Sequence, residues 1–470
     1  MGIHLRKSAL YDFTIFEKAE SLGGTWRDNS YPGAVCDVPS ISYSYSFAMK
    51  FDWSRKWSPQ SEILAYIEDC ARKYDVYRQI EFGTEIKHAE FDAERSVWVL
   101  TTDRGEVQEA DILITGTGQL NRPMIPDIPG LEEFEGPQFH SARWDHDIDL
   151  ARKRIAVIGS AASAVQLVPE IAREAARVTV LQRTPNWILP MGNRRYSETE
   201  IRRWKDHPWL PRLYRWWTYL SFEARWPLFR GNRFMQKGAE KFAQRYLEEV
   251  IRDPMLRESL TPDYPLGSRR LLASDHFLPA LNRENVDLET DKIDHIDAKN
   301  VVTASGRKIP ADVLVLATGF RSTEFLAPME IVGRDGKTLS DVWHNGAEAY
   351  LGLTVTDFPN FFMMYGPNTN LGHNSIIFMI ECQTAYIMDC LRRMDEEELS
   401  TLDLRPEVME RFNAKIQGEL DQTVFAQAER SWYKTAAGKV TNNWSTTTIR
   451  YWRQTRRVNL ADYSVGHNDT

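Results

Sequence analysis

The stretch RIAVIGSAASA at residues 154–164 decides the fold. Five mostly apolar residues of strand length lead to Gly159, and a turn of small residues follows. Ala161 and Ala164 stand where a dinucleotide-binding loop usually has its second and third glycines. Alanine still permits close packing, and amides at the start of the next helix remain open to a phosphate. The stretch predicts a strand, a turn and a helix of a nucleotide-binding α/β domain, although such a loop alone is a weak signal.

The end of the next strand indicates which nucleotide binds. Residues 178–181 form an apolar strand that is followed closely by Arg183. An acid at this place favours NADH, whereas a basic residue accommodates the 2′-phosphate of NADPH. An ordinary surface arginine is the alternative, and it stays open. The prediction is therefore an NADPH site formed by Gly159, Ser160, Ser163, Arg183 and Thr184.

A second nucleotide unit is indicated near the N-terminus. Residues 13–17 form a short strand that ends at Glu17, an acid placed to accept hydrogen bonds from ribose hydroxyls. A strand and a glycine-rich turn should precede it, but residues 1–10 look like the helix that follows such a turn. Either the natural product begins further upstream, which we favour, or the chain is a non-catalytic remnant with impaired cofactor binding. Both alternatives predict paired strands without their central partner.

Between the two units lies FEGPQFHSARWD at residues 134–145, which fits Phe-x-Gly-x-x-x-His-x-x-x-Trp. This pattern resembles the Baeyer-Villiger subgroup of flavin-dependent monooxygenases. Residues 366–373 and 431–435 resemble the branch that acts on aryl, steroid or other bulky ketones. The resemblance implies an α/β fold with two dinucleotide-binding, Rossmann-like, three-layer domains. Its expected parts are residues 1–145 (first FAD part), 146–325 (NADP part, with a helical insertion at about 195–260) and 326–470 (second FAD part and an irregular C-terminal wrap).

The resemblance also implies the activity. FAD and NADPH are the expected cofactors, and one atom of O2 is inserted beside the carbonyl of an apolar ketone through an oxygenated flavin, which gives an ester or lactone. A sulfur- or nitrogen-oxygenating flavin enzyme is the rival. Negative charge develops during the reaction, so a fixed cation is required. The resemblance places this cation at Arg270 and orients it with Asp37, which is expected to lie beside the flavin. It also assigns Arg269 to a cofactor phosphate and places Gly24, Thr25, Trp26 and Tyr43 along the flavin.

The residues alone also allow simpler roles at these positions. Arg269 and Arg270 can belong to a solvated loop, and Asp37 can stabilise a turn between a glycine and a proline. His140 and Trp144 are expected to couple domain movement to contact with NADP, and rigid packing is the alternative.

Composition narrows the class of protein further. The chain has 470 residues, 42% of them hydrophobic and 26% charged, enough for two or three domains. A net charge of -8 argues against nucleic acid as a partner. No apolar run could cross a bilayer, so we expect a cytoplasmic enzyme without membrane association. The four cysteines have no Cys-x-x-Cys spacing, and no metal site is predicted.

Residues 195–260 mix many aromatic side chains with arginines. Such a face can lie on a membrane, cover an apolar substrate, or pack against the parent domain. We favour packing.

Overall fold

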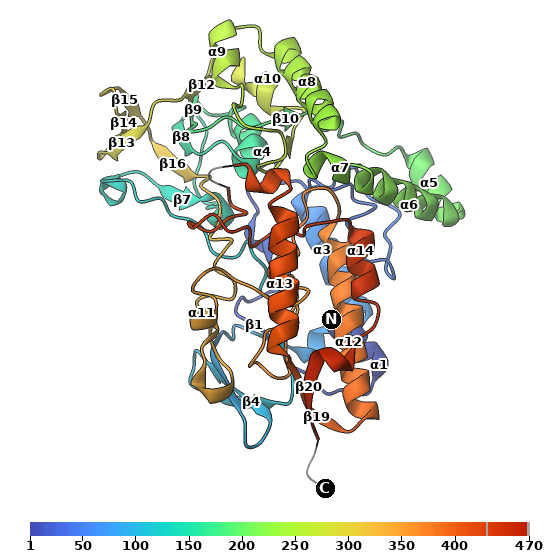
Figure 1. The fold of residues 1–470 in the computed structure, drawn as a ribbon. Helices are drawn as coiled ribbons and strands as arrows, with labels where there is room; N and C mark the ends of the chain where they lie inside the picture. Colours follow the sequence, from blue (N-terminus) through green and yellow to red (C-terminus); the bar gives the residue numbers. More distant parts are fainter. Residues whose placement is uncertain (429–430, 468–470) are drawn as a thin grey trace.

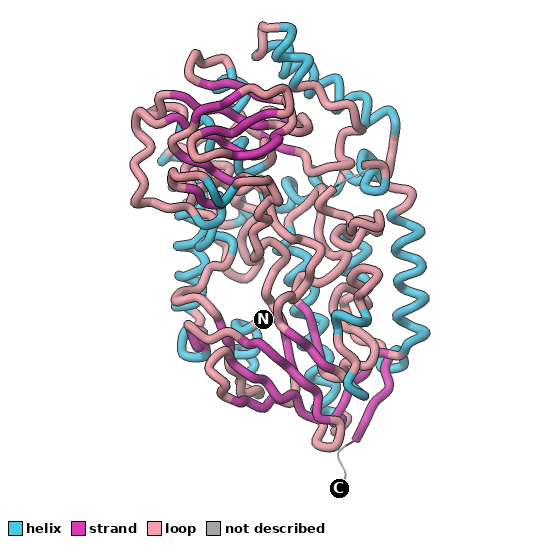
Figure 2. Tube along the Cα trace, turned by 90° about the vertical axis from the view of Figure 1, so that its left-hand side faces the viewer, coloured by secondary structure: helices cyan, strands magenta, loops and turns pink. Residues whose placement is uncertain are grey.

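The computed structural model describes residues 1–428 and 431–467. Strands gather in two groups at opposite ends of the molecule, and mostly loops lie between them (Figure 2). The upper group in Figure 1 holds β7 to β16, and the lower one holds β1, β4, β19 and β20. We call them the five-stranded unit and the split-sheet unit.

A parallel sheet in the order β12-β9-β8-β16-β7 forms the five-stranded unit. Its central strands are apolar and buried, as a sheet covered on both faces requires. Helices α4 (Ala162–Ile171) and α10 (Phe277–Leu281) share one hydrophobic cluster with it, and an antiparallel sheet shares another. The strands are β7 (Gln138–His140), β8 (Arg154–Ile158), β9 (Arg177–Leu181), β12 (Val286–Glu289) and β16 (Val313–Leu316), with β13 (Ile293–Ile296), β14 (Asn300–Thr303) and β15 (Lys308–Pro310) in the second sheet.

Two features of this unit bear on the sequence predictions. The predicted strand–turn–helix at residues 154–164 is present as β8 followed by α4. However, β7 pairs with β16 although it precedes residue 146. The predicted division at that residue therefore separates β7 from its own sheet. The division of the chain into three parts otherwise stays a prediction.

The split-sheet unit contains two separate parallel pairs, β1 with β2 and β6 with β18. The sequence predicted paired strands that lack a common central strand, and these two separate pairs agree with that prediction. A four-stranded sheet in the order β17-β3-β4-β5 packs beside them. The elements are α1 (Gly2–Ser8), β1 (Ile15–Glu17), α2 (Thr25–Asp28), α3 (Gln60–Lys73), β2 (Ile80–Phe82), β3 (Ile86–Asp92), β4 (Val97–Thr102), β5 (Val107–Ala110), β6 (Leu113–Thr115), β17 (Glu330–Val332), α11 (Leu339–Val342), β18 (Phe361–Met363) and α12 (Ile376–Glu396).

The predicted helical insertion at about 195–260 contains five helices, of which α5 to α8 lie along the upper right of Figure 1 and α9 lies at its top. They are α5 (Glu198–Asp206), α6 (Trp209–Glu223), α7 (Trp226–Phe229), α8 (Arg233–Val250) and α9 (Pro254–Ser259), and short strands β10 (Ile188–Leu189) and β11 (Leu272–Ala273) flank them. Packing was the favoured role of the aromatic side chains. It holds for Trp226 and Phe229, which are buried, but it is wrong for Trp209, Trp216 and Trp217, which are exposed.

The C-terminal stretch after Trp432 was expected to wrap irregularly over the surface; residues 431–447 do form no helix or strand, but the expected surface position is wrong for part of them. Residues 441–443 are fully buried, because their polar groups bond to the backbone and side chains of residues 366–370. Strand β20 also pairs antiparallel with β19. The elements here are β19 (Leu399–Leu404), α13 (Pro406–Leu420), α14 (Thr448–Gln454) and β20 (Tyr463–His467). Among residues 1–428 and 431–467, no helix has the length and apolar character needed to cross a membrane.

Candidate active site

An open cavity of about 2340 Å³ has walls from both units. Its lining includes the turns after β6, β8 and β16, at the carboxyl ends of parallel strands, where open α/β sheets bind ligands. A typical small-molecule site has a volume of about 300–1,000 Å³. The cavity is therefore large enough for more than one ligand.

Glycines on the cavity wall, where the main chain is not covered by a side chain, test whether dinucleotides fit in the cavity. Gly24, Gly116, Gly118 and Gly319 all line the cavity, and a Cβ atom at each would meet nothing within 4 Å. Side chains at these positions would fill space that a ligand can use, whereas glycine lets a phosphate or ring approach the main chain. The residues present fit FAD and NADP.

The predicted NADP residues lie together in the turn between β8 and α4 and at the end of β9. Gly159 has φ +110°, and a Cβ there would overlap the carbonyl oxygen of Ala317, so only glycine fits. Arg183 is exposed on the cavity wall, and within the described part of the chain it has no ion-pair partner. A free cation beside a phosphate-binding turn suits a 2′-phosphate. The cavity is also lined by Ser160, Ser163 and Thr184.

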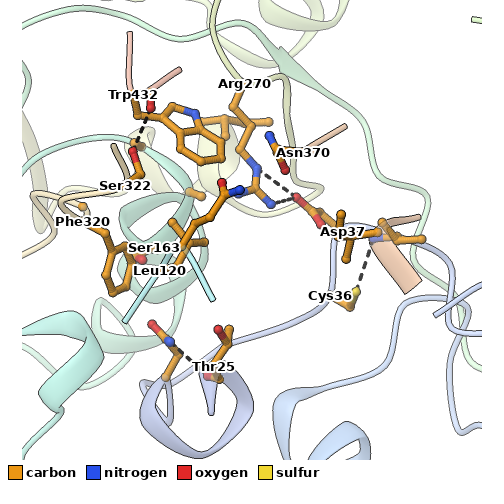
Figure 3. Close-up of a pocket in the computed structure, with 18 of the residues that line it drawn as sticks. Thr25, Cys36, Asp37, Leu120, Ser163, Arg270, Phe320, Ser322, Asn370 and Trp432 are labelled. Atoms are coloured by element: carbon orange, nitrogen blue, oxygen red, sulfur yellow. Dashed lines mark hydrogen bonds and ion pairs between the residues drawn. The ribbon is translucent and has the colours of Figure 1, made fainter. Parts of the chain in front are cut away.

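Arg270 and Asp37 meet at the centre of the site (Figure 3). Nε of Arg270 donates to Oδ2 of Asp37 at 3.1 Å, and Nη2 donates to the same oxygen. The charge of Asp37 raises the pKa of Arg270, so the guanidinium stays protonated. Its side chain is 36% exposed and lines the cavity. The pair therefore places a permanent positive charge on the cavity wall.

The loop that carries Asp37 rests on a helix of the other unit. Gln166, on α4, accepts a hydrogen bond from the hydroxyl of Tyr31 at 2.8 Å and donates to the carbonyl of Val35 at 2.9 Å. Gly33 has φ +84°, and a Cβ there would overlap the carbonyl of Gln166. The NADP-side helix thus fixes the position of Asp37.

The predicted flavin-side residues are only partly brought together. Thr25 and Trp26 line the cavity with Tyr43, and Nε1 of Trp26 donates to the hydroxyl of Tyr43 at 3.1 Å. Glu17 stands at the end of β1 as predicted, but it is not part of the cavity wall. Its carboxylate accepts from the amide of Ala19 at 2.9 Å and lies 3.2 Å from a guanidinium nitrogen of Arg27.

Arg269 has a different neighbour from Arg270. Its guanidinium lies 4.5 Å from the centre of the Tyr264 ring, and its buried Nε has no hydrogen-bond partner among the described residues. A buried donor without a partner costs free energy. Because Arg269 also lines the cavity, this group suits the expected contact with a cofactor phosphate.

Four residues around Arg270 were not predicted as site residues, namely Tyr365, Asn370, Trp432 and Tyr433. The Trp432 ring lies 5.9 Å from the guanidinium carbon, and the Tyr365 hydroxyl donates to Asn370 at 2.7 Å. Burial raises the pKa values of both tyrosines, so they remain neutral donors. The segments 366–373 and 431–435, which carry the resemblance, were the signal that could have identified them.

His140 is buried at the end of β7, and Trp144 packs edge to face against Phe139. Burial lowers the pKa of His140 to about 4, so the ring is neutral near pH 7. Its Nδ1 accepts from the amide of Ala142 at 3.1 Å, and the ring lies 5.6 Å from Phe320, a cavity residue. The pair is therefore placed between the five-stranded sheet and the cavity wall.

A shared cavity with a phosphate-binding turn after β8, bare glycines after β6 and β16, and a permanently charged arginine is typical of flavin- and nicotinamide-dependent oxidoreductases. The model of the flavin-binding monooxygenase-like family matches residues 9–199. A Baeyer-Villiger monooxygenase from Streptomyces coelicolor is 41% identical over 466 residues, which are 99% of this chain and 90% of that protein.

Solved structures agree with this match. An oxidized steroid monooxygenase bound to NADP has a TM-score of 0.90 at 30% identity, over 99% of this chain and 97% of that one. The structure described as OTEMO in complex with FAD and NADP has a TM-score of 0.89 at 26% identity, with the same coverage. The chain belongs to the Baeyer-Villiger group of flavin-dependent monooxygenases. The predicted fold class, the cofactors FAD and NADPH, and oxygen insertion beside a ketone carbonyl are thereby confirmed.

Proposed function

We propose that this monooxygenase converts a bulky, apolar ketone to an ester or lactone, and that Arg270 stabilises the negative charge that develops in the reaction. FAD reduced by NADPH supplies the activated oxygen. The single observation that supports the role of Arg270 is its pair with Asp37 on the cavity wall. Two of its five N–H groups are used by Asp37. The other three can be directed at an oxyanion.

Asp37 is a positioning residue in this proposal. Because Gln166 on α4 fixes the loop that carries it, binding of NADP next to α4 is linked to the place of the Arg270 cation. The buried hydroxyl of Tyr433 adds a neutral group beside it, whereas the Tyr365 hydroxyl is already bonded to Asn370. Charge and donors are thus arranged before the substrate enters, which lowers the cost of reorganisation during the reaction.

The substrate class is inferred from the walls around this cation. Large apolar side chains line the cavity, and a relative of similar fold is a steroid monooxygenase. Such walls favour a ketone with rings or a long chain over a small polar one. The apolar lining includes Leu120, Trp217, Phe229, Phe242, Phe320 and Trp432.

Turnover of matched substrates tests the proposal. Purified protein supplied with FAD and NADPH should convert phenylacetone and a steroid ketone to esters, and it should convert acetone much more slowly. Sulfoxide from thioanisole without ester from either ketone would instead establish the heteroatom-oxygenating rival. Protein that stays colourless with added FAD would identify the remnant. The cytoplasmic location stays a prediction.

A further inference from the structure

Helix α6 presents its most apolar face to solvent. Trp209, Trp216 and Trp217 are 60%, 63% and 68% exposed, and two leucines beside them, Leu213 and Leu220, are 61% and 49% exposed. At 100° per residue these five side chains fall on one stripe of the helix. A surface helix normally turns its polar face outward. An exposed apolar stripe of this size indicates a surface that binds something.

Two other side chains of α6 fasten the helix to the rest of the molecule, so the stripe cannot turn inward. Arg215 donates to the carbonyls of Ile41 and Ser44 at 2.9 and 2.7 Å. Glu223, at the last turn, accepts from the amide of Thr448 at 2.7 Å and is buried. The helix lies at the right-hand edge of the molecule, next to α5 (Figure 1).

The charge around the stripe points to the kind of partner. Residues 201–237 contain nine Lys or Arg and two Asp or Glu, whereas the whole chain has a net charge of -8. Most of these basic side chains are exposed, among them Arg202, Arg203, Lys205 and Arg212. Tryptophan, leucine and arginine on one helix suit the interface of an anionic lipid bilayer, where rings enter the headgroup region and basic groups meet lipid phosphates.

We propose that the outward face of α6, with the basic residues beside it, docks on the surface of an anionic phospholipid membrane. The protein lies on the lipid and does not span it. This changes the expectation drawn from the sequence, because only the structure shows that Trp209, Trp216 and Trp217 are largely exposed.

The docked face also adjoins the cavity. Trp217 and Phe242 are both exposed and both part of the cavity wall. A membrane-dissolved ketone could therefore pass from the lipid along these rings to the cavity, and this second part rests on the proposed function. The docking itself requires no turnover.

Vesicle flotation separates the two parts. We expect the protein to float with vesicles of equal parts phosphatidylglycerol and phosphatidylcholine, and to float much less with phosphatidylcholine alone or at high salt. The double variant Trp209→Ser/Trp216→Ser should lose at least tenfold in partitioning, because neither ring is part of the cavity wall but both form the stripe. Val107→Ser, which removes an exposed apolar side chain from β5 in the split-sheet unit, is the matched control and should float as the wild type does.

Wild-type protein that stays below the anionic vesicles overturns the docking, and so does a double variant that floats unchanged. Sedimentation velocity tests whether the face instead binds a second copy of the chain. If the wild type is a dimer, the double variant is a monomer and the wild type does not float, the face is assigned to that second copy. Delivery is tested by turnover of a steroid ketone dissolved in the vesicles. Suppose that the wild type floats with the vesicles and converts a water-soluble aryl ketone. If the double variant then oxidises the lipid-dissolved ketone as fast as the wild type, delivery along α6 is wrong, while the proposed function stands.

Discussion

Replacing Arg270 with alanine removes the cation that the site directs at the reacting oxygen. In the structure two N–H groups of Arg270 bond to Asp37, and the rest of the guanidinium faces the cavity. Loss of one preorganised donor at a developing oxyanion costs about 2.7–4 kcal/mol, equivalent to about 10²–10³ in kcat. We therefore expect ester formation by Arg270→Ala to fall at least about a hundredfold.

The assay follows ester by gas chromatography, and NADPH consumption and hydrogen peroxide in parallel. Arg270→Ala should still consume NADPH, with most of the oxygen released as hydrogen peroxide, because the lost charge serves the later step. Arg270→Lys keeps a positive charge but not the planar set of donors, so its rate should lie between those of the wild type and the alanine variant. Arg95→Ala, which removes an exposed arginine paired with Asp92 and Glu109, controls for the loss of an ion pair alone. Ester formation by Arg270→Ala within about threefold of the wild type, in folded protein that binds FAD, would refute the reasoning.

Three further predictions concern the cofactor, the domain junction and stability. Arg183→Ala should raise the KM for NADPH at least about tenfold and leave the KM for NADH nearly unchanged, because only NADPH carries the 2′-phosphate; equal effects in initial-rate kinetics would contradict this role. His140→Ala should keep NADPH-driven reduction of FAD but release more hydrogen peroxide per ester formed, whereas an unchanged product yield would leave His140 a packing role only. Burial raises the pKa of Glu223, but its contacts with His373, Asn374 and Thr448 outweigh this and hold it at about 2, below the usual 4.5. A carboxylate whose pKa is lower in the folded state stabilises the fold at pH values above its unfolded-state pKa. Glu223→Gln should therefore lose about 3 kcal/mol of unfolding free energy above about pH 5, and this loss should shrink as the pH falls toward about 2. A pH-independent difference between the two proteins in urea titrations would contradict the prediction.

Local patterns were sufficient for much of the fold. The apolar run at residues 154–158 and the small residues after it can form little else than a buried strand and a turn, and both are present. Strands 97–102 and 177–181 likewise follow their apolar patterns. The boundary at residue 146 failed because β7 is only three residues long, and its membership of the sheet depends on pairing with β16, far away in sequence.

The resemblance predicted most of the site, and the residues alone predicted only the two strand ends that meet a nucleotide. An arginine after a strand indicates a phosphate, but nothing near Glu17 in the sequence shows that Arg27 and the amide of Ala19 would hold its carboxylate outside the cavity wall. Trp432 and Tyr433 were missed although the segment 431–435 carries the resemblance, because the composition of this polar stretch does not show that it folds back beside Arg270.

The sequence by itself determined the two nucleotide units and the charged groups, because strand periodicity, turn chemistry and permanent charge are local properties, and the resemblance at residues 134–145 implied the class of protein. Only the tertiary structure decided that Glu17 lies outside the cavity wall and that the tryptophans of α6 face outward. Both depend on which surfaces the packed chain leaves free, and that is a property of the whole fold.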